Sequence, residues 1–157
     1  MTEQSPTPEP PQAAGQVSDA VRGNWVDRLA PAATRPYLRL SRADRPIGTW
    51  LLLLPCWWGL TLAILADQSP RWEDLWIFAG CGLGAILMRG AGCTWNDIAD
   101  RDIDGKVART RSRPIPSGAV SVKQALAWMV LQSLIALGIL LPFHPAAIAM
   151  GVLSLLT

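Results

Sequence analysis

The stretch IGTWLLLLPCWWGLTLAILA, from Ile47 to Ala66, runs for twenty residues without a charged side chain. A helix of that length covers about 30 Å, the thickness of the hydrocarbon core of a bilayer. Pro55 stands in the middle of the run, where it would weaken a helix in water but is tolerated in a membrane-spanning one. The stretch therefore predicts a transmembrane helix.

Three more apolar runs follow the first one. The second extends from Leu75 to Trp95 with a single charge at Arg89, the third ends at Leu141, and the fourth is still apolar where the chain stops. We predict an all-α, polytopic membrane bundle with spans at about 47–66, 75–95, 122–141 and 146–157. Because the chain stops within an apolar run, we expect the rest of the bundle to be missing. Glycines that would permit close helix packing in the second span are Gly80, Gly82, Gly84, Gly90 and Gly92.

The composition of the 157 residues agrees with a membrane protein. Charged residues make up 17% and hydrophobic residues 50%, whereas an ordinary globular domain carries about 25% charged residues. The net charge is only +2 and no basic tract is present, so nucleic-acid binding has no electrostatic support. Three scattered cysteines fit neither a disulfide framework nor a paired metal site.

The segments before the first span divide into two parts. Residues 1–24 are rich in proline and polar residues, and we predict a disordered tail. They do not resemble a targeting peptide, because three acidic residues precede the first arginine, Arg22. Residues 25–45 interleave arginines with apolar residues, which is typical of an interfacial segment in front of a membrane domain that we place at 46–157.

The basic residues also predict the orientation of the bundle. They concentrate before the first span and in the loop after the second, whereas Arg71 alone lies between spans one and two. Cytoplasmic loops carry the excess of lysine and arginine. We therefore expect the N-terminus and the 96–121 loop to face the cytoplasm, with the protein in a bacterial inner membrane.

A polar cluster begins where the second span ends. Asn96 and four aspartates lie within nine residues. If this part stays helical, steps of about 100° place Asn96 at 0°, Asp100 at 40°, Asp104 at 80° and Asp97 at 100°, all on one face. Asp102 falls at about 240° and is expected to face water or to pair with an arginine.

Three carboxylates and an amide on one face need a positive partner. Oxygen ligands of this kind suit Mg²⁺, which completes its coordination with substrate phosphate. The arginines that follow suit phosphate recognition. Together they predict a diphosphate substrate with a lipid-soluble remainder, and the simpler alternative is a charged loop that only enforces topology.

The motifs resemble a known family. The pattern from Asn96 to Asp104, followed by Arg109-Thr110-x-x-Arg113-Pro114-x-Pro116-x-Gly118, looks like the first aspartate-rich motif of the UbiA superfamily of intramembrane prenyltransferases. Residues 45–55, RPIGTWLLLLP, and 88–93, MRGAGC, resemble more narrowly the 4-hydroxybenzoate polyprenyltransferases of ubiquinone biosynthesis. This resemblance implies the N-terminal part of a nine-helix bundle, with a second aspartate-rich loop in the missing C-terminal half.

The resemblance also implies the roles of individual residues. Substrates would be a polyprenyl diphosphate and 4-hydroxybenzoate, with Mg²⁺ as cofactor and the lipid bilayer as surroundings. The metal would be held by Asn96, Asp97, Asp100 and Asp104, the diphosphate would be clamped by Arg109 and Arg113, and weaker substrate-binding candidates are Lys106, Arg111, Arg45 and Arg89. Arg89 or Arg45 would bind the acceptor carboxylate or organise the aspartates, and the alternatives are snorkelling for Arg89 and a simple flanking charge for Arg45.

Other readings stay open at this point. Within the superfamily, the acceptor would instead be that of the haem O, homogentisate, chlorophyll or menaquinone enzymes. Outside it, the chain would be a fragment of a transporter or a membrane anchor. A transporter predicts acids at mid-membrane depth on several spans, whereas here they gather in one loop at the end of a span.

Overall fold

The computed structural model describes residues 23–154, and these residues form only helices and connecting turns. Residues 1–22, which hold nearly all of the expected tail, and residues 155–157 lie outside the described part. The helices are α1 (Trp25–Leu29), α2 (Arg35–Leu40), α3 (Ile47–Asp67), α4 (Trp72–Ala99), α5 (Arg101–Asp104), α6 (Val122–Leu140) and α7 (Pro145–Leu153).

Three of these helices are long and apolar enough to cross a membrane, namely α3, α4 and α6. They coincide with the first three expected spans, and α3 continues through Pro55 as predicted for a spanning helix. α4 is longer than its apolar run, because it extends past Trp95 to Ala99. The fourth expected span appears within the described residues only as α7, which at nine residues is too short to cross a bilayer.

Close packing of α4 against its neighbours depends on two of the five predicted glycines. A methyl group added to Gly80 would lie 2.9 Å from the Phe143 ring, and one added to Gly90 would lie 2.6 Å from the Gln132 amide. Around Gly82, Gly84 and Gly92 the described residues leave open space. The prediction of close packing is therefore confirmed at two positions and not at the other three.

The segment before the first span is folded rather than simply basic. Asn24 caps α1 with its side chain, and Arg39 pairs with Asp27 at 2.8 Å. α2 ends in a Schellman motif, in which the Ala43 amide donates to the Leu38 carbonyl and the Arg42 amide to the Arg39 carbonyl. Arg42 occupies the left-handed position of this motif with φ of 53°, where a residue with a Cβ costs about 1 kcal/mol more than glycine.

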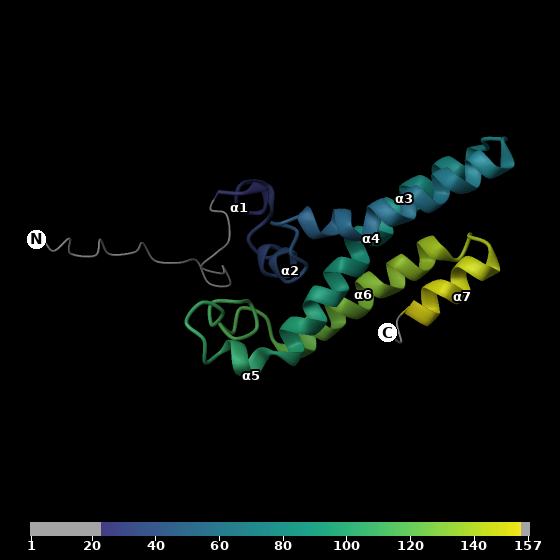
Figure 1. The fold of residues 1–157 in the computed structure, drawn as a ribbon. Coiled ribbons are helices and arrows are strands. Elements are labelled where there is room, and N and C mark those ends of the chain that lie inside the picture. The colour runs from purple at the N-terminus through teal and green to yellow at the C-terminus, as the bar shows by residue number, and fades with distance from the viewer. Residues whose placement is uncertain (1–22, 155–157) are drawn as a thin grey trace, which may run out of the picture.

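The segment before the first span, residues 25–46, which we call the arm, lies at the same end of the bundle as the aspartate-rich segment. Figure 1 shows α1, α2, α5 and the loop before α6 at this end, with the α3–α4 and α6–α7 turns at the other. A small core joins α2 to α4, α6 and the loop. Its buried residues are Leu40, Ile98, Ile115, Val120 and Ala125, with Tyr37 packed against them.

Candidate functional site

The aspartate-rich segment is almost continuous with α4. Asp100 caps the end of α4. Its carbonyl accepts hydrogen bonds from the Ile103 and Asp104 amides, and these bonds form the turn of α5. The helical wheel therefore applies across the break. Asn96 and Asp100 are exposed, whereas Asp97 and Asp104 are buried. The predicted polar face thus has an exposed edge, formed by Asn96 and Asp100, and a buried edge, formed by Asp97 and Asp104.

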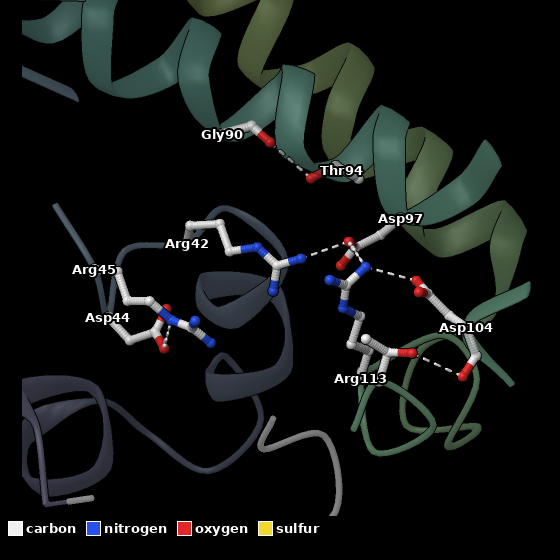
Figure 2. Close-up of polar contacts among 9 residues, drawn as sticks. Arg42, Asp44, Arg45, Gly90, Thr94, Asp97, Asp104 and Arg113 are labelled. Carbon is white, nitrogen blue, oxygen red and sulfur yellow. Dashed lines mark hydrogen bonds and ion pairs between the residues drawn. The ribbon is translucent and has the colours of Figure 1, made fainter. Parts of the chain in front are cut away.

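Two arginines hold the buried edge. Asp97 Oδ1 accepts from Arg42 Nη2 at 2.6 Å and from Arg113 Nη1 at 3.3 Å, and Arg113 Nη1 also donates to Asp104 Oδ2 at 2.6 Å. Figure 2 shows Arg42 reaching Asp97 from one side and Arg113 from the other. The Asp97 side chain is only 1% exposed, and a buried carboxylate requires such partners because desolvation is costly. We call these four residues the buried ion network.

The loop after α5 is held in place by its own contacts. The Thr110 hydroxyl, which is buried, donates to the Asp104 carbonyl at 3.0 Å. The Val120 amide donates to the Pro114 carbonyl, and Ile115 and Val120 belong to the core. The exposed basic residues of this fixed loop are Lys106, Arg109 and Arg111. Asp102 pairs with Arg101 at 3.5 Å and is exposed, which confirms its prediction.

Arg89 and Arg45 lie apart from the buried ion network. The Arg89 guanidinium rests against Gly48, where an added methyl group would overlap it. Among the described residues Arg89 Nε is buried without a hydrogen-bond partner. Arg45 pairs with Asp44 at 3.4 Å, beside the start of α3. The structure thus does not join Arg89 or Arg45 directly to the predicted aspartates.

The chemistry of the donor set suits Mg²⁺. The exposed edge offers the carboxylate oxygens of Asp100 and the amide oxygen of Asn96. Hard oxygen ligands of this kind are those that Mg²⁺ prefers. Within residues 23–154, however, no three acidic, histidine or cysteine side chains already converge on one metal position. These residues therefore fit a metal that is completed by further ligands, such as phosphate oxygens.

Sequence reasoning did not find Arg42. It treated the arginine as one of several interfacial charges, because nothing in the sequence links it to an aspartate 55 positions later. Its position offers a partial signal. In Leu38-Arg39-Leu40-Ser41-Arg42, a helix ends at a site that favours glycine, and a charged residue there suggests a side chain with a partner.

Comparison with known proteins identifies the family of this chain. The profile of the UbiA prenyltransferase family matches residues 52–157. The chain belongs to the UbiA prenyltransferase family. No solved structure matches it.

Curated relatives of this UbiA-family chain have related names. It is 53% identical over 131 residues to the mitochondrial 4-hydroxybenzoate polyprenyltransferase of Rattus norvegicus, covering 83% of the chain and 34% of the relative. It is 45% identical over 133 residues to the Arabidopsis thaliana protein of the same name, covering 85% and 32%. It is 42% identical over 137 residues to 4-hydroxybenzoate geranyltransferase 1 of Lithospermum erythrorhizon, covering 87% and 43%. The chain thus spans about a third of the polyprenyltransferases that it matches.

Proposed function

We propose that the chain is the N-terminal part of a 4-hydroxybenzoate polyprenyltransferase of ubiquinone biosynthesis that uses Mg²⁺. The observation that carries this proposal is the exposed edge, Asn96 and Asp100, beside a fixed arginine-rich loop at the end of membrane-spanning helices. The names of the relatives support 4-hydroxybenzoate as the acceptor. They include both polyprenyl and geranyl transferases, so they leave the length of the prenyl chain open.

We assign the residues of the site to two roles, metal binding and phosphate binding. When bound, Mg²⁺ would offset the charge that develops on the diphosphate as the C–O bond to the prenyl group breaks. Its ligands would come from Asn96, Asp100 and Asp104, with Asp97 buried behind them. Arg109 is the first candidate to clamp the diphosphate, with Lys106 and Arg111 exposed on the same loop.

Unlike the exposed Arg109, the other predicted clamp, Arg113, is half-buried in the loop. Its Nη1 already donates to Asp97 and Asp104.

The diphosphate leaves with the electrons of the C–O bond, and the ring carbon next to the acceptor hydroxyl forms the new C–C bond and loses its proton. A site at the end of membrane helices favours this step because it limits the access of water.

Arg89 is the candidate for the acceptor carboxylate. A guanidinium whose buried Nε has no partner among the described residues, inside a membrane-spanning helix, is expected to bind an anion. Arg45 at the start of α3 would assist it.

The arm and the aspartate-rich segment lie at the same end of the bundle (Figure 1). In a bacterial cell we place this end on the cytoplasmic side of the inner membrane. The names of the polyprenyltransferase relatives specify mitochondria instead.

The test replaces Asp100 in the complete enzyme. Membranes with the Asp100→Ala variant are assayed with labelled 4-hydroxybenzoate, a polyprenyl diphosphate and Mg²⁺, with and without a chelator. We expect transfer to fall by about 10²- to 10³-fold with membrane insertion unchanged, and the chelator to abolish transfer by the unaltered enzyme. Asp67→Ala, at an exposed aspartate paired with Arg71 at the opposite end, is the matched control. Normal turnover by Asp100→Ala would contradict the metal site.

A further inference from the structure

Arg42 is held in a backbone conformation that its residue type disfavours. It occupies the left-handed position of the Schellman motif that ends α2. In the described part of the chain, Gln68 is the one other non-glycine residue with positive φ. A non-glycine residue keeps such a conformation when contacts of the surrounding structure, here those of its side chain, stabilise it. For Arg42 that contact is visible, because its guanidinium lies 2.6 Å from Asp97 Oδ1.

Asp97 differs from Asp100 in what surrounds it. Asp97 is 1% exposed and is approached by two guanidinium groups, whereas Asp100 faces outward. Asp97 Oδ2 has no hydrogen-bond partner among the described residues, but a divalent cation placed on it would be repelled by both arginines at short range. The same cation at the exposed edge would meet oxygen ligands and open access for phosphate.

The buried ion network links three separate segments. Arg42 belongs to the arm before α3, Asp97 to α4 and Arg113 to the loop before α6, and Arg113 also fixes Asp104 of α5. The Ser41 hydroxyl next to Arg42 accepts hydrogen bonds from Trp128 Nε1 and Gln132 Nε2 of α6. The backbone next to Arg42 is therefore fixed to α6 through Ser41.

We propose that Arg42 is a positioning residue and that Asp97 is its anchor rather than a metal ligand. Resting on the function proposed above, this assigns Arg42, Asp97 and Arg113 to holding Asp104 and the arginine-rich loop in position. Asp104 then joins the exposed edge in binding the metal, and the loop binds the diphosphate. The arm in front of the first span is then part of the catalytic unit and not only an interfacial segment.

The experiment compares three substitutions in the complete enzyme. Arg42→Gly removes the side chain and also relieves the strain of the left-handed backbone. We therefore expect this variant to fold. Asp97→Asn keeps the shape of the anchor and removes its charge. Gln68→Gly is the matched control, since it also relieves a left-handed residue but lies at the far end of α3.

The first measurement is limited trypsin cleavage after Lys106, Arg109 and Arg111 with chelator present, so that metal plays no part. We expect Arg42→Gly and Asp97→Asn each to speed cleavage at least about tenfold, because cleavage follows local opening of the loop. The double variant should add little to either single one, since both break the same contact. Gln68→Gly should leave cleavage unchanged, and Arg42→Lys should restore part of the protection.

The second measurement is Mn²⁺ binding in the presence of inorganic diphosphate. Asp97→Asn should keep the affinity within about threefold of the unaltered enzyme, whereas Asp100→Asn should lose it. Unchanged trypsin cleavage in Arg42→Gly, or a loss of Mn²⁺ affinity in Asp97→Asn as large as in Asp100→Asn, would overturn the proposal. Neither measurement depends on prenyl transfer, so failure of this proposal is distinguishable from failure of the proposed function.

Discussion

At the scale of single residues, Gly48 and Arg89 show how a small residue makes room for a charge. Gly48 lies in the first turn of α3, and its missing side chain leaves space that the Arg89 guanidinium of α4 fills. A guanidinium in a spanning helix is costly unless an anion or a polar surface meets it. Among the described residues Arg89 Nε meets no such partner, and an acceptor carboxylate would provide one.

Gly48→Ala is therefore expected to displace Arg89 and to weaken acceptor binding. In the complete enzyme we expect the KM for 4-hydroxybenzoate to rise about tenfold, which corresponds to one lost hydrogen bond to a charged group. The KM for the polyprenyl diphosphate should stay the same. Gly59→Ala is the control on the same helix, because nothing lies within 4 Å of its added methyl group. Equal kinetics for the two variants would exclude a role for Arg89 in acceptor binding.

At the scale of elements, α4 and α6 share the most extensive helix–helix contact, and it includes a polar position. Gly90 of α4 faces Gln132 of α6, which is buried and donates to the Ser41 hydroxyl of the arm. Thr94, also fully buried, donates to the Gly90 carbonyl. The arm, α4 and α6 thus meet at one position, where a larger residue would displace the Gln132 amide.

Gly90→Ala is expected to separate these three elements. The added methyl group would lie 2.6 Å from Gln132 Nε2 and 3.0 Å from Ser41 Cβ, and overpacking of this kind costs about 1–3 kcal/mol. Gly92→Ala, two residues along the same helix, meets open space and should leave stability within about 0.5 kcal/mol. Thermal unfolding of the two variants in the same detergent measures the difference. Equal melting temperatures would show that the contact at Gly90 is not tight.

The positions of the long helices follow from the sequence because the bilayer sets one simple requirement. A run such as Ile47–Ala66 has no charge, so its helix is predictable to within a residue. The polar face of Asn96 and Asp100 was also predictable, since the helical wheel continues across the break. The pairing of Arg42 with Asp97 was not, because it depends on how α2 turns back onto α4, and local sequence does not determine that path.

At the scale of the whole molecule, the described residues bury little of their apolar surface. Large hydrophobic residues are exposed along α3, including Trp58, Leu62 and Leu65. Lipid covers part of such a surface, and further helices of the same enzyme would cover the rest. Three helices of spanning length and a chain that covers a third of its relatives agree with a partial bundle.

Expressed alone, the chain is therefore expected to be unstable in detergent. Without packing partners, the apolar faces of α3 and α7 should lead to aggregation, because these faces exceed what a soluble monomer exposes. Size-exclusion chromatography of the chain and of the complete enzyme in the same detergent measures this. A sharp, monodisperse peak with cooperative unfolding for the chain alone would contradict the expectation.

The contact between Arg42 and Asp97 also places a constraint on the order of events during synthesis. The two residues are 55 positions apart, and at ribosomal rates Asp97 is made about 3–11 s after Arg42. During that interval the arginine has no access to its partner. The arm therefore reaches its final contact only after α3 and most of α4 have been made, so its docking is a late step in the folding of this chain.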